Sequence, residues 1–372
     1  MNSQIISVFG SSVGKEEIAN VKFCMKRQWI GFGKDVESFE EAYKEKFGLQ
    51  SFAMVDSGSN ALYLAIKLLD IQPYSQIILP SFTWVSCAHA VILAGHEPVF
   101  CDVDLDTMNV THWDIKKKIT RYTGAIMVVH YAGLSCDMDP ILELGYPVIE
   151  DAAHAINSTY KGKLCGTIGD VGIYSFDAVK NLTTGEGGGV TARNPDLITK
   201  AKQLRYCGIG KSGFDTAMSD GNGRWWEHEI YEPFIKMLPT NIAACIGLAQ
   251  LKRFDALQKR RKQIWDMYQK NLMIPEITLP VGAKDDRHSY FTFCIRANKR
   301  DDLAKFLLKK GIYTTLRYKP LHYYPIFKQT DVSLPFSERL EREALNIPLH
   351  PRMTDEEVNR VISGILEFYG RG

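Results

Sequence analysis

Short, uninterrupted apolar runs recur along the first half of the chain and alternate with segments long enough to be crossover helices or loops. An apolar run without polar alternation is typical of a strand that is buried on both faces, as in parallel sheets. We therefore expect a largely parallel sheet, and in such sheets ligands bind beyond the carboxyl ends of the strands. The runs are Ile77 to Leu79, Pro98 to Val103, Ala125 to Val129, Val148 to Glu150, Gly172 to Phe176 and Gly189 to Ala192.

One lysine follows such a run. Residues 171–190 read VGIYSFDAVKNLTTGEGGGV, so a short β-rich run leads to Lys180 and then to a glycine-rich loop. Glycine permits the tight backbone turn that this loop needs. An amine near a strand end, beside a permissive loop, can hold a carbonyl group as an imine. The alternative is a solvated loop lysine, the commonest environment of this residue type.

A second feature is the sequence Ser57-Gly58-Ser59-Asn60, which precedes an apolar helical run from Ala61 to Leu69. Small polar residues at a helix start leave free backbone N–H groups at the positive end of the helix dipole, and this arrangement suits a phosphate. Ordinary helix capping by Ser or Asn explains the same residues.

An aromatic residue and an acid follow two other runs. Trp84 comes after the run at 77–79, and Asp151 directly follows the run at 148–150. Pyridoxal phosphate requires phosphate donors, a side chain that stacks on its ring, a carboxylate for its pyridinium nitrogen and a lysine for its aldehyde. A buried Asp151 needs a partner, which a protonated ring nitrogen supplies. Taken singly, Trp84 is also compatible with a core position and Asp151 with a strand-end cap. The sequence contains no G-x-x-x-x-G-K-[ST] phosphate loop.

The rest of the chain predicts helices and a second, smaller unit. A helix is expected at 34–48, with Gly48 as its C-terminal cap, and a long helix at 241–272. We expect a large α/β domain over residues 1–250, and a linking helix with a smaller α+β domain over residues 251–372. The elements expected in the smaller domain are strands at 290–296, 312–317 and 345–348, a helix at 301–310 and a last helix that a capping box at Thr354 begins.

Charge and cysteine content limit the partners. The chain has 45 Lys and Arg against 43 Asp and Glu, spread along its length, so neither nucleic acid nor an anionic membrane is an expected partner. The eight cysteines lack metal-ligand spacing, so we expect reduced thiols and no metal site. The first ten residues lack a signal-peptide pattern, and no eighteen apolar residues run together. A cytoplasmic protein is expected.

Six stretches resemble the DegT/StrS-type nucleotide-sugar aminotransferases, and together they cover nearly the whole chain. The resemblance implies fold type I of the pyridoxal-phosphate enzymes and a homodimer with active sites at the subunit interface. The stretches are Ser57 to Leu62 (SGSNAL), Pro80 to Trp84 (PSFTW), Val129 to Gly133 (VHYAG), Val148 to Ala155 (VIEDAAHA), Ser175 to Gly188 (SFDAVKNLTTGEGG) and Gly247 to Leu251 (GLAQL).

The resemblance also implies roles for individual residues. Lys180 would hold the cofactor aldehyde as an imine, Asp151 would meet the pyridine nitrogen, and Trp84 would stack on the ring. His154 stands where the family usually has Gln or His near the phenolic oxygen of the cofactor. The residues that would hold the cofactor phosphate are Gly58, Ser59 and Ser175.

Lys236 aligns with a family Asn or Lys that reaches the cofactor phosphate of the neighbouring subunit. Two departures from the family pattern bear on this assignment. The family commonly has Ser-Phe-His where this chain has Ser-Phe-Asp, ending at Asp177, and the segment 234–241 lacks the frequent Gly-Tyr-Asn-Tyr-Arg motif. Candidates for sugar-nucleotide contact, for each of which packing is an equal alternative, are Trp225, Tyr231, Arg317, His322 and Tyr323. An equal alternative for Arg317 is to bind the carboxylate of the amino donor.

The aldimine lysine implies transamination, since relatives that dehydrate or deoxygenate the sugar have histidine in its place. The expected donor is L-glutamate and the expected acceptor a nucleotide-linked ketosugar. Thr184 to Gly188 resembles the loop of enzymes that aminate C4, which favours a dTDP-linked 4-keto-6-deoxyhexose as acceptor. The product would be a 4-amino-4,6-dideoxy sugar for O-antigen or another surface glycan. The alternatives are amination at C3, another type I reaction on a small amino acid, and a non-catalytic regulator.

Overall fold

The structure is a computed structural model of the 372-residue chain and describes residues 5–210, 217, 224–329 and 331–371. Its centre is a seven-stranded sheet with the strand order β1-β9-β8-β5-β4-β2-β3. The sheet is mostly parallel, as predicted, and only β9 runs against its neighbours β1 and β8. The strands are β1 (Ala53–Val55), β2 (Gln76–Pro80), β3 (Glu97–Cys101), β4 (Thr123–Val129), β5 (Val148–Asp151), β8 (Val171–Ser175) and β9 (Gly188–Ala192).

Both faces of this sheet are buried. In β4, Ala125 and Met127 belong to the core cluster on one face, whereas Ile126 and Val128 belong to the cluster on the other. Helices α3, α4 and α7 contribute to the first core, and α5 and α6 contribute to the second. This two-sided packing explains why the strands read as unbroken apolar runs. The helices are α3 (Gly58–Leu68), α4 (Val85–Leu93), α5 (His112–Lys116), α6 (Met138–Leu142) and α7 (Pro195–Leu204).

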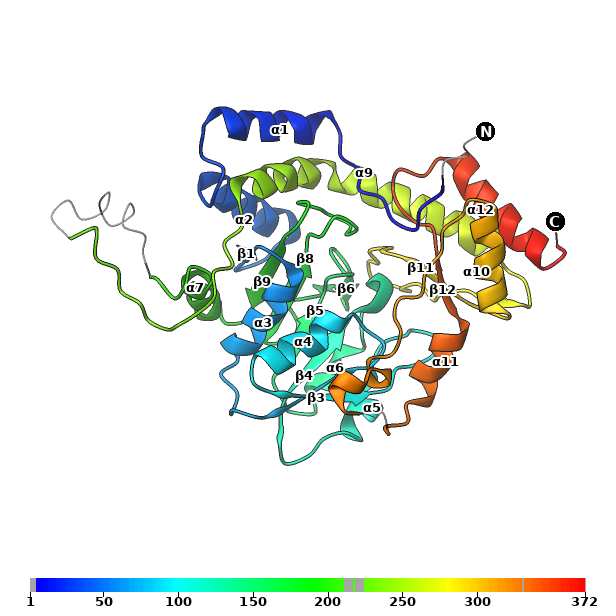
Figure 1. The fold of residues 1–372 in the computed structure, drawn as a ribbon, viewed down its shortest axis with the longest axis horizontal. Helices are drawn as coiled ribbons and strands as arrows, with labels where there is room; N and C mark the ends of the chain where they lie inside the picture. The colour runs from blue at the N-terminus through cyan, green and yellow to red at the C-terminus, as the bar shows by residue number, and fades with distance from the viewer. Residues whose placement is uncertain (1–4, 211–216, 218–223, 330, 372) are drawn as a thin grey trace.

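A long helix, α9 (Asn241–Asn271), joins the two parts of the molecule. Helices α1 (Lys15–Lys26) and α2 (Lys34–Phe47) lie along the first half of α9, and its other end reaches the C-terminal helices (Figure 1). Gly48 ends α2 in the left-handed conformation at φ 69°, as the sequence predicts. None of the described helices has the length and apolarity that a bilayer span requires.

The second part is a three-stranded antiparallel sheet with helices against it. Thr354 begins the last helix with a capping box, as predicted. Its elements are β10 (Ile277–Thr278), β11 (Phe293–Ala297), β12 (Ala344–Ile347), α10 (Arg300–Lys309), α11 (Pro335–Glu343) and α12 (Asp355–Phe368). The remaining short elements of the chain are β6 (Thr159–Tyr160), β7 (Lys163–Leu164), η1 (Tyr131–Gly133), η2 (Leu321–Tyr323) and η3 (Pro325–Phe327).

The strand predicted at 312–317 is wrong. The segment makes only two isolated bridges, from Ile312 to Ile6 and from Thr315 to Asn346. Because its two ends pair with different parts of the chain, no regular ladder forms. The N-terminal segment is thereby attached to the C-terminal part: the Ile6 N–H group donates to Gly311 O at 2.8 Å, and the Tyr313 N–H group donates to Ile6 O at 2.9 Å.

The described residues of the segment between α7 and α9 reach away from the body of the molecule (Figure 1). At its base, Tyr206 pairs with Lys236, and Ile209 pairs with Ile230. A loop as long as residues 208–232 is usually functional or contacts a partner subunit, and residues 211–216 and 218–223 of it lie outside the described part of the chain.

Candidate active site

The loop that carries Lys180 joins β8 to β9. Its backbone is closed by hydrogen bonds from the Lys180 N–H group to Asp177 O at 3.0 Å and from the Thr184 N–H group to Phe176 O at 2.9 Å. The Asp177 carboxylate also accepts from the Val179 N–H group at 2.8 Å. Gly185 has φ 85°, a conformation that favours glycine. The loop is therefore a bonded turn that fixes where the lysine projects.

Lys180 lies against an aromatic ring and close to a second cation. Its Nζ is 4.8 Å from the centroid of the buried Phe291 ring, and the guanidinium carbon of Arg317 is 5.2 Å from the same centroid. Burial and the positive charge of Arg317, opposed by the negative charge of Asp151, together lower the pKa of Lys180 to about 8. Near neutral pH a usable fraction of this amine is therefore uncharged.

The start of α3 and the end of β8 meet closely enough to form an anion cradle. Ser57 caps the helix by accepting from the Asn60 N–H group at 3.1 Å, and the first N–H groups of a helix have no intrahelical acceptor. A Cβ added to Gly58 would lie 2.8 Å from Ser175 Oγ, and one added to Gly188 would lie 2.3 Å from Ser57 O. Glycine at these two positions therefore keeps the cradle open and allows β9 to pass beside it.

Asp151 is buried at the carboxyl end of β5, with 6% of its surface exposed. Its Oδ1 accepts from the Ala153 N–H group at 2.9 Å. Its Oδ2 accepts from the thiol of Cys87 at 3.2 Å. A carboxylate has about four acceptor positions, so capacity remains for one further donor.

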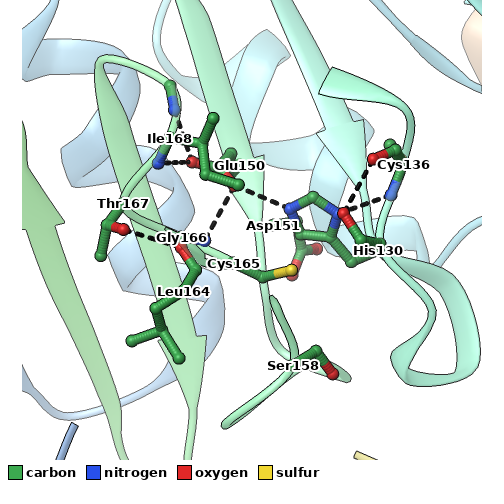
Figure 2. Close-up of polar contacts among 12 residues, drawn as sticks. His130, Cys136, Glu150, Asp151, Ser158, Leu164, Cys165, Gly166, Thr167 and Ile168 are labelled. Carbon is green, nitrogen blue, oxygen red and sulfur yellow. Dashed lines mark hydrogen bonds and ion pairs between the residues drawn. The ribbon is translucent and has the colours of Figure 1, made fainter. Parts of the chain in front are cut away.

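Glu150, the residue before Asp151, is completely buried and anchors β5 by hydrogen bonds to the backbone of a neighbouring loop. Its two oxygens accept from the N–H groups of Gly166, Ile168 and Gly169 at 2.8, 2.6 and 2.6 Å. Figure 2 shows the first two of these bonds and the contact of Glu150 with His130. Because successive strand residues point to opposite faces, Glu150 holds β5 while Asp151 points the other way.

His154 is neutral and has one nitrogen without a partner. Its Nε2 lies 3.1 Å from the hydroxyl of Tyr318, and its ring stacks on Phe291 at a centroid distance of 4.1 Å. Burial holds the pKa of His154 well below its usual value, and the charges of Lys180 and Arg317 act in the same direction. Its buried Nδ1 has no hydrogen-bond partner among the described residues.

Trp84 is the N-cap residue of α4 and is 55% exposed, so it is not a core residue. Its ring lies 5.6 Å from the ring of Tyr318. Tyr318 is buried, which raises its pKa to about 12, so its hydroxyl stays protonated. Ser86, two residues after Trp84, connects α4 to the start of α3, because its hydroxyl is 2.7 Å from that of Ser59.

The remaining candidates lie in two other settings. Trp225, Tyr231 and Lys236 are exposed on the projecting segment, and within one chain no described contact joins them to Lys180. His322 is 1% exposed, and its Nδ1 lies 2.7 Å from Ser81 Oγ. Its neighbour Tyr323 is partly buried, with its ring 4.5 Å from that of His322.

Residues 11–366 match the model of the DegT/DnrJ/EryC1/StrS aminotransferase family. The chain belongs to this family. The resemblance read from its sequence motifs is thereby confirmed, and the chain is a sugar aminotransferase of the pyridoxal-phosphate type.

Relatives across the whole chain agree with this membership. The dTDP-4-dehydro-2,3,6-trideoxy-D-glucose 4-aminotransferase of Saccharopolyspora spinosa is 35% identical over 96% of this chain and 95% of its own length. The spore coat polysaccharide biosynthesis protein SpsC of Bacillus subtilis is 34% identical over 95% of this chain and 94% of its own length.

Solved structures agree in fold. The aminotransferase TlmJ from Streptoalloteichus hindustanus has a TM-score of 0.92 and 34% identity, and the match covers 98% of this chain and 99% of that one. The pyridoxal-phosphate form of the sugar aminotransferase Spr1654 from Streptococcus pneumoniae has a TM-score of 0.89 and 26% identity over 97% of each chain. The family fold is therefore fold type I, as predicted.

The residues present fit pyridoxal phosphate. The cradle at Gly58 is open because glycine has no side chain. The buried Nδ1 of His154 has no partner among the described residues, so a polar atom of the cofactor could bind it. The spare acceptor capacity of Asp151 suits a ring N–H donor, and an amine with a pKa of about 8 suits an aldehyde.

Three side chains of this candidate active site were not predicted from the sequence: Cys87, Phe291 and Tyr318. Cys87 lies three residues after Trp84, and its closeness in sequence to a predicted site residue is a usable signal. Phe291 and Tyr318 reach the site from the C-terminal part of the chain, and no local pattern marks them.

Proposed function

We propose that the enzyme transfers the amino group of L-glutamate to C4 of a dTDP-linked 4-keto-6-deoxyhexose. The product is a 4-amino-4,6-dideoxy sugar nucleotide for a surface glycan such as the O-antigen of lipopolysaccharide. The observation that carries this proposal is the 35% identity, over 96% of the chain, to a relative named as a 4-aminotransferase of a dTDP-4-keto sugar. The loop Thr184 to Gly188 supports C4, and the spore coat relative supports a surface polysaccharide.

Pyridoxal phosphate, when bound, supplies an aldehyde that takes up the amino group and a ring that accepts the electron pair of the reacting carbon. Lys180 is the residue we assign to the aldehyde and to proton transfer. Its pKa of about 8 leaves the Nζ able to accept a proton from the α-carbon of glutamate. In the second half of the reaction, the same Nζ delivers a proton to C4 of the sugar.

Other residues bind and orient. We assign Asp151 to the ring nitrogen, since its buried carboxylate has acceptor capacity beyond its two protein donors. We assign the phosphate to Gly58, Ser59 and Ser175, which share the cradle at the start of α3. Trp84, whose indole is exposed, would cover the ring, and His154, whose Nδ1 has no partner among the described residues, would bind a polar atom of the cofactor.

Arg317 is the group we assign to the carboxylate of the donor. Its guanidinium carbon lies 3.7 Å from the centroid of Phe9, so the side chain is held in place by aromatic contact. It lies on the same Phe291 ring as Lys180. A carboxylate bound there would bring the α-carbon of glutamate close to the Nζ of Lys180.

We also propose that the enzyme works as a homodimer. The projecting segment exposes Trp225, Tyr231 and Lys236, and large exposed aromatic side chains are typical of interaction surfaces. We assign these three residues to the sugar nucleotide and cofactor phosphate of the partner subunit. The described cysteines are all free thiols, which suits a cytoplasmic location.

A panel of substrates tests the acceptor. The purified enzyme, L-glutamate and dTDP-, UDP- or GDP-linked 3-keto and 4-keto sugars are incubated together, and the product is identified by NMR. We expect amination at C4 of the dTDP-linked 4-keto-6-deoxyhexose, whereas amination at C3 would overturn the assignment. The protein is expected to be yellow and to lose its visible absorption band with L-glutamate, and a band that only another amino acid removes would overturn the choice of donor.

A further inference from the structure

Cys87 is a buried thiol that contacts the carboxylate of Asp151. It lies in the first turn of α4 with 0% of its surface exposed, and its Sγ is 3.2 Å from Asp151 Oδ2. Thr83 Oγ1 lies 3.4 Å from the same sulfur. Among the residues that the structure describes, the side chain that donates to Asp151 is thus a thiol.

The thiol stays protonated, so it always acts as the donor in this contact. Burial raises the pKa of Cys87 well above its usual value, and the negative charge of Asp151 raises it further. An S–H group is a weak hydrogen-bond donor in comparison with a hydroxyl. A donor to a carboxylate stabilises its charged form and lowers its basicity, and a weak donor lowers it less.

The same helical turn carries Trp84. The Cys87 N–H group donates to Trp84 O at 3.1 Å, so the backbone that positions the thiol also positions the indole. A change in the side chain at position 87 can therefore act on Asp151 without removing the backbone contact that holds Trp84.

We propose that Cys87 is a positioning residue that orients Asp151 Oδ2 with a weak thiol donor, which competes less with the ring N–H group for this oxygen than a hydroxyl would. The inference rests on the proposed function, in which Asp151 accepts a hydrogen bond from the ring nitrogen of the cofactor. A more basic carboxylate forms a stronger hydrogen bond with the ring N–H group. The thiol orients Oδ2 while it leaves most of the negative charge available to the ring.

The test compares the substitutions Cys87→Ala and Cys87→Ser in the holoenzyme. The readout is the proton NMR resonance of the ring N–H group, assigned with cofactor that carries ¹⁵N in its ring. This resonance moves to lower field as the hydrogen bond strengthens. We expect Cys87→Ala to move it to lower field, because no donor competes for Oδ2, and Cys87→Ser to move it to higher field, because a hydroxyl competes more strongly.

Cys101→Ala is the matched control. Cys101 is also completely buried and donates from its thiol to a backbone carbonyl, Leu79 O, at 3.4 Å. We expect this control to leave the ring N–H resonance in place. The rates of the two Cys87 variants are expected to stay within about tenfold of wild type, since only one hydrogen bond, from a weak donor, is changed.

Two results would overturn the inference: an unchanged resonance in both Cys87 variants, or shifts of both in the same direction, which a packing effect alone would produce. Asp151→Asn separates this failure from failure of the proposed function. If the ring nitrogen signal is the same in Asp151→Asn and wild type, Asp151 does not meet the ring. If the ring nitrogen signal changes in Asp151→Asn but not in the Cys87 variants, only the role proposed for Cys87 is wrong.

Discussion

The Nε2–H group of His130 donates a hydrogen bond to Glu150 Oε2 at 2.8 Å, and both side chains are completely buried (Figure 2). The Cys136 N–H group donates to the other ring nitrogen, Nδ1, at 3.1 Å. The ring proton therefore sits on Nε2, and the imidazole is neutral. Glu150 is thus a buried carboxylate whose charge is stabilised by hydrogen bonds alone, directly beside Asp151.

Glu150→Gln should destabilise the fold. The backbone N–H group of Gly166 donates to one carboxylate oxygen, and those of Ile168 and Gly169 donate to the other. The NH₂ group of the amide would replace one of these oxygens and place a donor against a donor. We expect a loss of about 3 kcal/mol in the free energy of unfolding, measured by urea denaturation. Glu143→Gln, at an exposed position after α6, is the control and should cost almost nothing. Equal stability of the two variants would contradict the proposed anchor.

Lys180→Ala should remove transamination. We expect a fall of at least about 10³-fold in the rate with glutamate, because the variant lacks both the amine for the aldehyde and the base for proton transfer. Lys163→Ala changes an exposed lysine of β7 and should leave the rate unchanged. A Lys180→Ala enzyme that retains a tenth of the wild-type rate would show that another base carries the proton.

The pH dependence of the glutamate half-reaction should follow the free amine of Lys180. The amine acts in its uncharged form, so the single-turnover rate should rise with pH and level off above a pKa of about 8. Removing the positive charge in Arg317→Gln should raise this pKa and move the rising limb to higher pH, whereas Arg317→Lys should keep it in place. A limb that does not move in Arg317→Gln would contradict the electrostatic coupling of the two residues.

Asp151→Asn separates two roles of the carboxylate. If Asp151 only anchors the ring, the loss is that of one charged hydrogen bond, about 1.5 to 3 kcal/mol, or roughly ten- to a hundredfold in rate. If it keeps the ring nitrogen protonated, the loss is larger. We expect more than a hundredfold in kcat with glutamate, and a variant within tenfold of wild type would refute the second role.

The large sheet was predictable because each of its central strands is buried on both faces and reads as an apolar run. Lys180 and Asp151 were found by the same logic, since both follow such runs closely. Helix α1 gave no comparable signal, because only Glu17 and Cys24 of its residues are buried and its apolar periodicity is weak. The strands β6 and β7 have two residues each, which is too short to show an alternation of apolar and polar residues in the sequence.

Contacts between distant parts of the chain set the limit of prediction in the candidate active site. Cys87 meets Asp151 across 64 residues, and Tyr318 meets His154 across 164. The failed strand at 312–317 has the same origin, because Ile312 pairs with Ile6 and Thr315 pairs with Asn346, so the segment does not pair with one neighbouring strand. Local sequence patterns do not show which residues come into contact across such long separations in the chain.

The N-terminal segment has a practical consequence for protein engineering. Ile6 pairs with Ile312, Phe9 supports the guanidinium of Arg317, and the hydroxyl of Ser11 donates to Ala178 O, two residues before Lys180. A short stretch ahead of the first helix therefore touches both the donor-binding and the lysine-bearing parts of the site. An affinity tag, a fusion partner or a trimmed expression boundary placed close to Phe9 is expected to disturb turnover, and a C-terminal attachment after α12 is the safer choice.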